Sequence, residues 1–356
     1  MEVGIPNAEQ TLHDRRIERI TPLATPALLM HEHPLPAERV EQVVSHREQV
    51  TAILDREDPR LMVVVGPCSV HDPAAALDYA QRLAALAPEL EDLLLVMRVY
   101  FEKPRTTTGW KGLINDPTLD DSGDVNTGMR MARELLLDVL ELGLPVGCEF
   151  LDPIIPQYIA DTVSWGAIGA RTTESQTHRQ LASGLSMPIG FKNRTDGDVA
   201  VAVDAVRAAA APHSFTGVEV TGGSAILRTT GNEDCHVILR GGAEPNYDAE
   251  SIATTLGRLR DVGLPERVIV DASHANSGKD HEHQPPVSQE IGRQVAAEGN
   301  EAIVGVMLES FLVAGNQPIS DDLVYGQSIT DKCMDWETTV EVLQGLDEDA
   351  RARRSR

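Results

Sequence analysis

Apolar and polar positions alternate in a regular way along the chain from about residue 60 onward. Short runs of consecutive apolar residues, rich in β-branched side chains, are separated by longer segments with apolar residues at helical spacing. Such continuous runs are typical of parallel strands that are buried on both faces. The runs lie at 61–66, 93–99, 146–151, 166–171, 188–193, 236–241, 267–273 and 302–309. The helical segments lie near 73–90, 126–143, 155–164, 174–185, 198–210, 248–262, 286–298 and 335–346. Eight strands alternating with eight helices predict a (β/α)8 TIM barrel.

Two parts of the chain fall outside this alternation. Residues 213–230 contain two strand-like runs joined by a Gly-Gly turn, which predicts a β-hairpin inserted between the fifth helix and the sixth strand. Residues 1–60 precede the barrel, with a proline-rich stretch that predicts an extended arm and residues 36–57 that predict an amphipathic helix. We expect the barrel over 61–350 and a solvated basic tail over 351–356. A doubly wound open sheet is the alternative, but the chain lacks the glycine-rich phosphate-binding sequence expected after its first strand.

Composition narrows the class of protein. The 31 basic and 55 acidic residues give a formal net charge of −24, which disfavours nucleic acid and anionic membrane surfaces as partners. The four cysteines are too few and too far apart for a disulfide framework. No apolar run reaches the roughly 18 residues of a membrane span. We therefore expect a cytoplasmic enzyme. Taken as an average, the charge also disfavours small anionic ligands.

The carboxyl ends of the predicted strands carry a different signal. In a barrel of this kind the active site lies at those ends. Each of the eight predicted strands ends on, or is followed closely by, a side chain with acid–base, anion-binding or metal-binding chemistry. In chain order these side chains are Cys68, Arg98, Glu149, Arg171, Lys192, Arg240, His274 and Glu309. Any single one could be a surface ion pair or a capping residue, but all eight on one face predict an active site.

Cations form the larger group at this face. Arg98, Arg171, Lys192 and Arg240 end four strands, and the loop after the second strand adds Lys103, Arg105 and Lys111. Arginine binds phosphate and carboxylate oxygens with two parallel hydrogen bonds, and lysine supplies a compact charge. Converging cations require anions, so one or two phosphorylated or carboxylated substrates are expected despite the acidic average.

A second group could bind a metal ion. Cys68, His274, Glu309 and, further along the chain, Asp331 offer one sulfur, one nitrogen and two carboxylates, a donor set that suits a divalent transition metal. The spacing alone is a weak signal, because a cysteine such as Cys68 is more often a small buried apolar residue. Two other histidine-rich stretches, 31–33 and 281–283, fall in predicted loops, and we interpret them as solvated surface.

Longer motifs resemble a known family. They are VVGPCSVHDP (64–73), MRVYFEKPRTTTGWKGLINDP (97–117), GAIGARTTESQ (166–176), GFKN (190–193), DCHVILRGG (234–242), SHANS (273–277), GVMLES (305–310) and SITDKC (328–333). Together they resemble the type I 3-deoxy-D-arabino-heptulosonate 7-phosphate (DAHP) synthases, in particular the subgroup sensitive to aromatic amino acids. The resemblance runs from residue 13 to residue 333, nearly the whole chain.

The resemblance implies an activity. It is a metal-dependent condensation of phosphoenolpyruvate with erythrose 4-phosphate that gives DAHP and phosphate, the first step of the shikimate pathway. It assigns one divalent ion (Mn, Fe, Co or Zn) to the ligands Cys68, His274, Glu309 and Asp331. It assigns the phosphate of phosphoenolpyruvate to Arg171 and Arg240, its carboxylate to Arg98 and Lys192, and erythrose 4-phosphate to Lys103, Arg105 and Thr106. Candidate catalytic residues are Lys103, Glu149 and His274.

The resemblance also implies regulation and assembly. A feedback pocket for Phe or Tyr is expected from Asp14, Pro156, Gln157, Ser186, Phe215 and Gly217. A glycine at 217 would leave space for a phenolic hydroxyl, which favours Tyr. A homodimer or tetramer is expected, assembled partly through the N-terminal arm. The hairpin departs from the family pattern, because it carries 219–222 as Glu-Val-Thr-Gly where T-K-x-G is common.

Three alternatives stay open at this point. The chain could be another phosphoenolpyruvate–sugar synthase, although many of those that work without metal have Asn in place of Cys68. It could be a Schiff-base aldolase that uses Lys192. It could also be a catalytically silent paralogue that senses an aromatic amino acid or binds a partner enzyme, although the complete set of metal ligands argues against this.

Overall fold

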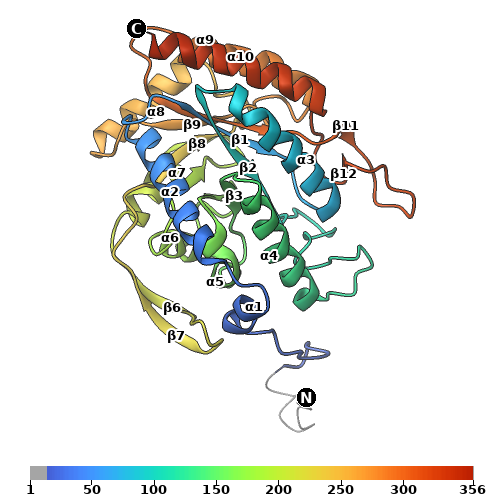
Figure 1. Ribbon diagram of the computed structural model, residues 1–356. Helices are drawn as coiled ribbons and strands as arrows, with labels where there is room; N and C mark the ends of the chain where they lie inside the picture. The colour runs from blue at the N-terminus through green and yellow to red at the C-terminus, as the bar shows by residue number, and fades with distance from the viewer. Residues whose placement is uncertain (1–13, 356) are drawn as a thin grey trace.

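Eight parallel strands close into a barrel in the computed structural model, which describes residues 14–355 (Figure 1). The strands are β1 (Leu61–Gly66), β2 (Leu93–Arg98), β3 (Val146–Glu149), β4 (Trp165–Ile168), β5 (Ile189–Lys192), β8 (His236–Leu239), β9 (Val268–Asp271) and β10 (Ile303–Glu309). Their order is β1-β10-β9-β8-β5-β4-β3-β2, and β1 pairs with both β10 and β2. The predicted TIM barrel is confirmed, and the open-sheet alternative is wrong. Residues 1–13 of the expected arm and Arg356 of the expected tail lie outside the described residues.

Helices follow the strands around the outside of the barrel (Figure 1). They are α3 (Pro73–Leu86), α4 (Val125–Glu141), α5 (Pro156–Ile159), α6 (Gln176–Ala182), α7 (Ala200–Ala209), α8 (Ala249–Asp261), α9 (Gln284–Val295) and α10 (Trp336–Arg354). Short 3-10 turns lie at Ala87–Glu89, Ala160–Thr162 and His281–His283, and a small sheet pairs β11 (Val313–Asn316) with β12 (Gln327–Ser328). The helix expected near 155–164 is therefore a single α-turn and a 3-10 turn, because the β-branched Val163 is already extended.

The barrel interior is packed and closed at its N-terminal end. Inward-facing residues such as Met62, Val96 and Met307 form one buried cluster. Helix α2 (Ala37–Leu54) contributes Val50, Ile53 and Leu54 to that same cluster. This end of the barrel is therefore filled with apolar side chains, and the opposite, carboxyl end of the strands is left for a site.

The inserted segment is the hairpin that the sequence predicts. Strands β6 (Ser214–Val218) and β7 (Ser224–Arg228) pair antiparallel and belong to a sheet separate from the barrel. Figure 1 shows the hairpin projecting from the barrel beside α1. Its side chains alternate between half-buried and exposed, and Ile226 is 75% exposed.

The N-terminal arm differs from the expectation of an extended segment. It contains α1 (Pro26–Glu32), in which Thr25 Oγ1 accepts a hydrogen bond from Leu28 N and Pro26 occupies the first turn. Proline favours this position because its fixed φ is already helical and its missing N–H would have no helical partner. His31 and Glu32 therefore lie on a helix instead of a loop. The arm is tied to the hairpin by the 2.9 Å hydrogen bond from Ala27 N to Val220 O.

The C-terminal residues also differ from the expectation. Helix α10 continues to Arg354, so 351–354 do not form a free tail. The reason is Asp92, which is 1% exposed and forms ion pairs with Arg351 (3.0 Å) and Arg354 (2.8 Å). Arg353 donates a hydrogen bond to the carbonyl oxygen of Ile303. Within residues 14–355, neither α10 nor any other helix is long and apolar enough to cross a membrane.

Candidate active site

The strand ends meet in one cavity at the carboxyl end of the barrel. The cavity has a volume of about 280 Å³. Of the eight predicted strand-end residues, Cys68, Arg98, Glu149, Arg171, Lys192, Arg240 and His274 line it. Lys103, Arg105, Thr106 and Asp331 line it too. Glu309 lies at the edge of this space, fully buried behind Arg98 and His274. Lys111 is exposed and does not line the cavity, so its expected place among the cations is wrong.

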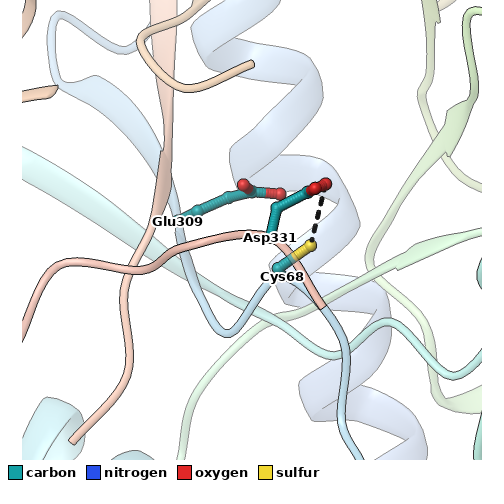
Figure 2. Close-up of side chains that lie close together, drawn as sticks. All are labelled: Cys68, Glu309 and Asp331. Atoms are coloured by element: carbon teal, nitrogen blue, oxygen red, sulfur yellow. Dashed lines mark hydrogen bonds between the residues drawn. The ribbon is translucent and has the colours of Figure 1, made fainter. Parts of the chain in front are cut away.

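Three of the four expected metal ligands lie together (Figure 2). Donor atoms of Cys68, Glu309 and Asp331 all lie within 4.8 Å of one another. The Sγ atom of Cys68 is 3.6 Å from Oδ2 of Asp331. The fourth residue, His274, adjoins this group, with Nε2 3.6 Å from Oε1 of Glu309. These residues come from four separate places in the sequence. Cys68 follows β1, His274 follows β9, Glu309 ends β10 and Asp331 follows β12.

The chemistry of this donor set fits a divalent transition metal. It combines a thiol, an imidazole and two carboxylates, and Nδ1 of His274 lies 2.8 Å from Oδ2 of Asp271, which orients the ring as a second-layer carboxylate does in metal sites. Lys103 Nζ lies 2.7 Å from Cys68 Sγ and 2.9 Å from Asp331 Oδ2, so the group already attracts a cation. Burial raises the pKa of the Cys68 thiol to about 11, and metal binding to this sulfur would therefore release a proton.

His274 is held in an unusual backbone conformation. Its φ of 53° lies in the left-handed region, which costs free energy for a residue with a side chain. Asp271 is fully buried, and although burial alone would raise its pKa, His274 and Lys192 outweigh burial and hold the pKa well below its usual value. The resulting carboxylate accepts hydrogen bonds from Lys192 Nζ (3.1 Å) and Ser273 Oγ (2.6 Å). Asp271 therefore fixes both a metal-type ligand and a cavity cation.

Most hydrogen-bond donors of Arg98 already bond to other groups of the protein. It is 1% exposed, and its guanidinium donates to the carbonyl oxygens of Pro67 and Cys68 (both 3.0 Å). It also donates to Glu309 Oε1 (2.9 Å) and contacts Met307 Sδ (3.3 Å). A guanidinium has five N–H donors, so one is left for a ligand. Arg98 thus positions Glu309 and the Cys68 backbone as well as facing the cavity.

Within residues 14–355, two other arginines form no ion pair. Arg171 makes one hydrogen bond, from Nη2 to Thr106 Oγ1 (3.2 Å). Arg240 has a buried Nε with no hydrogen-bond partner among residues 14–355. Its pKa is lowered by burial, and the neighbouring Arg171 adds to that lowering. Two cations that share a cavity and repel each other are the arrangement that a bound phosphate would stabilise.

Glu149 depends on a glycine that the sequence analysis did not single out. An ideal Cβ on Gly169 would lie 2.3 Å from Glu149 Oε1, so the absent side chain makes room for this carboxylate. Gly169 follows β4 by one residue, and this strand-end position was the available signal. Asp271 was also missed; it lies inside the predicted run 267–273 and is the last residue of the observed strand β9, three residues before His274.

Glu102 is a further cavity residue that the sequence analysis missed. Burial raises its pKa to about 8, and its carboxyl group accepts hydrogen bonds from the backbone N–H groups of Leu151 (3.3 Å) and Asp152 (3.1 Å). It thereby joins the loop after β2 to the loop after β3. Its place directly before Lys103 was the only signal in the sequence.

The expected effector residues are spread over several elements. Asp14 is exposed in the arm, Pro156 and Gln157 begin α5, and Phe215 and Gly217 lie on β6. The arm contacts α5 through the 2.8 Å hydrogen bond from Tyr158 Oη to Ala24 O.

Two observations differ from the effector pocket that we expected. Ser186 lines a separate cavity of about 480 Å³ beside α2, which none of the other five residues lines. An ideal Cβ on Gly217 would lie 2.6 Å from Leu227 Cδ1. Leu227 therefore fills the space that we expected for a phenolic hydroxyl, and the argument for Tyr is wrong.

Comparisons with known proteins agree with this geometry. Residues 40–344 match the family described as the DAHP synthetase I family. The chain is 54% identical to the Phe-sensitive phospho-2-dehydro-3-deoxyheptonate aldolase of Escherichia coli, covering 96% of this chain and 98% of the relative. It is 51% identical to the Tyr-sensitive aldolase of the same organism over 92% and 93% of the two chains. The solved structure of the Francisella tularensis aldolase superposes with a TM-score of 0.93 at 50% identity, covering 95% and 99%.

Proposed function

The chain belongs to the DAHP synthetase I family of enzymes, and from this premise we propose that it condenses phosphoenolpyruvate with erythrose 4-phosphate to give DAHP and inorganic phosphate. The observation that carries the proposal is the cavity itself. It places Arg171 and Arg240, which form no ion pair within the described part of the chain, beside a group of metal-type donors. This combination suits an anionic phosphorylated substrate whose partner is an aldehyde.

Binding of the two substrates follows from the position of the cations. Arg171 and Arg240 would hold the phosphate of phosphoenolpyruvate, and Lys192 with the remaining donor of Arg98 would hold its carboxylate. Erythrose 4-phosphate would bind at the more exposed edge formed by Arg105 and Thr106, next to Lys103. The cations would keep two anions together that otherwise repel each other.

A divalent metal ion would be held by Cys68, His274, Glu309 and Asp331. When bound, such an ion supplies Lewis-acid chemistry that polarises the aldehyde carbonyl. Mn, Fe, Co and Zn all accept a mixed sulfur, nitrogen and oxygen donor set. The chain's part is to orient the donors, as Asp271 does for His274 and Arg98 does for Glu309.

Proton transfer would fall to two residues. As C3 of phosphoenolpyruvate bonds to the aldehyde carbon, the ammonium of Lys103 would give a proton to the aldehyde oxygen. Water then adds at C2, and the carboxylate of Glu149 would accept its proton. In the resulting hemiketal phosphate the bond between C2 and the bridging oxygen would break, while the C2 hydroxyl becomes the ketone and its proton passes to the departing phosphate. Arg171 and Arg240 would stabilise that phosphate.

Phosphate release by the purified protein tests the proposal. With both substrates and Mn(II), we expect steady release of inorganic phosphate, and with EDTA or with either substrate alone we expect none. A Cys68→Ala variant, which removes one metal donor, should lose the metal-stimulated rate. Absence of phosphate release from the metal-loaded wild type, together with binding of an aromatic amino acid, would support the silent sensor instead.

An aromatic amino acid is the proposed effector. Relatives of comparable similarity are named for different amino acids, and Leu227 fills the space beside Gly217, so the structure offers no preference between Phe and Tyr. The support for a site is the contact of the arm with both α5 and the hairpin. Initial rates with Phe, Tyr and Trp added singly identify the effector, and unchanged rates with all three would contradict the proposal.

A further inference from the structure

Tyr100 lies inside the barrel beneath the active-site cavity. It follows Arg98 by two residues, and the backbone stays extended between them, with Val99 N bonded to Gly147 O (2.8 Å). Residues two apart on an extended chain point to the same side, so both side chains face the interior. Tyr100 is 1% exposed and lines the cavity. Its ring lies against the guanidinium of Arg98, with Cζ 3.7 Å from the ring centroid.

The hydroxyl of Tyr100 is buried without a partner. Oη has no hydrogen-bond partner among residues 14–355. Of the buried polar atoms in this condition, only Tyr100 Oη and Arg240 Nε belong to residues that line the cavity within the described chain. Buried hydroxyls are normally bonded, because an unpaired buried polar group costs free energy. Burial raises the pKa of Tyr100, so the group stays an O–H donor.

Arg98 explains why a second donor is needed beside it. The Arg98 guanidinium makes four contacts, to Pro67 O, Cys68 O, Glu309 Oε1 and Met307 Sδ, which leave one N–H free among residues 14–355. Arg98 therefore cannot bind a carboxylate through the usual pair of parallel hydrogen bonds. The Tyr100 ring lies against the same guanidinium, and its hydroxyl is a donor without a partner among residues 14–355.

We propose that the Tyr100 hydroxyl donates a hydrogen bond to the carboxylate of bound phosphoenolpyruvate, as the second donor beside Arg98. The inference rests on the proposed function and adds a substrate-binding residue to it. The ring has a separate task, since it supports the Arg98 guanidinium through a cation–π contact. Removing the hydroxyl while keeping the ring therefore isolates the proposed contact.

Tyr100→Phe in the metal-loaded enzyme is the test. Because a hydrogen bond to a charged group is lost, we expect the Kd and KM for phosphoenolpyruvate to rise about 10-fold to about 100-fold. The KM for erythrose 4-phosphate should stay unchanged. The Tm should not fall, since the hydroxyl bonds to none of the residues that the structure describes. Calorimetric titration with phosphoenolpyruvate alone gives the Kd.

Tyr79→Phe is the matched control. Tyr79 is fully buried, lies outside the cavity, and its hydroxyl is bonded to Ser310 Oγ (3.0 Å). We expect this variant to lower the Tm and to leave the Kd for phosphoenolpyruvate unchanged.

Two results would overturn the inference. An unchanged Kd for phosphoenolpyruvate in Tyr100→Phe, with an active wild type, would overturn it alone, and a lower Tm alongside would assign the hydroxyl a structural role. A metal-loaded wild type that neither binds phosphoenolpyruvate nor releases phosphate would overturn both the inference and the proposed function.

Discussion

At the scale of single residues, the site depends on an absent side chain at Gly169 and on the contacts that Arg98 makes with the protein. Gly169 has no side chain, and the Glu149 carboxylate occupies the space that a Cβ would need. Most N–H groups of the Arg98 guanidinium donate hydrogen bonds to Glu309 and to the backbone carbonyl oxygens of Pro67 and Cys68. These contacts fix the positions of Glu149, Glu309 and the Cys68 backbone before a substrate arrives, and such preorganisation is how an active site lowers the free energy of the transition state.

Gly169→Ala should remove activity without unfolding the protein. The new Cβ would lie 2.3 Å from Glu149 Oε1 and would push the carboxylate out of place. If Glu149 moves a proton, kcat should fall about 100-fold or more. The control is Gly257→Ala in α8, where an added Cβ has nothing within 4 Å and the helix should gain stability. Near wild-type kcat in Gly169→Ala would remove Glu149 from the mechanism.

His236 makes stability depend on pH. Burial lowers its pKa to about 3, and its Nε2 accepts a hydrogen bond from Trp165 Nε1 (3.1 Å). The pKa of this histidine is about 6.5 in the unfolded chain. Between pH 6.5 and pH 3 the imidazole is therefore protonated in the unfolded chain and neutral in the folded chain, so the free energy of unfolding falls as the pH falls. This residue alone should cost about 2 kcal/mol between pH 8 and pH 5. Urea unfolding at both pH values checks this, and His236→Gln should reduce the difference; an equal difference in the variant would contradict it.

At the scale of elements, local pattern and distant partners contribute differently. The barrel strands were predictable because each is a short apolar run, buried along nearly its whole length. Helix α1 was missed because its prolines suggested an extended arm, whereas Pro26 at the first turn favours a helix. The end of α10 was missed because its arginines pair with Asp92, which lies more than 250 residues away. No local pattern contains that partner.

Deleting residues 351–356 should destabilise the barrel. The deletion removes both arginines that pair with the buried carboxylate of Asp92. An unpaired buried charge typically costs about 3 kcal/mol or more, and we expect the Tm to fall accordingly. Deleting only 355–356 is the control and should leave the Tm unchanged. Equal Tm values for both deletions would show that the Asp92 pairs contribute nothing.

The sequence predicted part of the site, as it predicted most but not all of the helices and strands. The rule that barrel active sites lie at strand ends located seven of the cavity-lining residues, because their positions follow from the strands. Asp331 lies after β12, outside the barrel strands, so the strand-end rule did not locate it; its carboxylate made it a candidate metal ligand only together with Cys68, His274 and Glu309. Tyr100 and Gly169 act through burial and close approach, and neither property is visible in a single sequence.

At the scale of the whole molecule, the average charge and the local charge have opposite signs. The chain carries −24 overall, yet Arg98, Lys103, Arg105, Arg171, Lys192, Arg240 and Lys279 line one cavity. The excess acid is spread over the outside, where it favours solubility. An average charge therefore says little about what a concave site binds.

Assembly is the second property at this scale. Exposed apolar side chains gather on the arm, α1, α2 and the hairpin, and they include Ile17, Ile20, Leu28, Val44 and Ile226. We propose that a second copy of the chain covers them. Ile226→Asp should then lower the mass measured by light scattering, whereas Val324→Asp, a change at an exposed residue before β12, should not. A monomeric wild type, or an Ile226→Asp variant of unchanged mass, would contradict the proposal.

The central claim is a bond between C3 of phosphoenolpyruvate and the aldehyde carbon of erythrose 4-phosphate. Mass spectrometry of the metal-loaded enzyme with uniformly ¹³C-labelled phosphoenolpyruvate and unlabelled erythrose 4-phosphate tests it directly. We predict a seven-carbon sugar phosphate that carries all three labelled carbons, formed together with inorganic phosphate. Labelled pyruvate beside unchanged erythrose 4-phosphate would show hydrolysis without condensation and would contradict the claim.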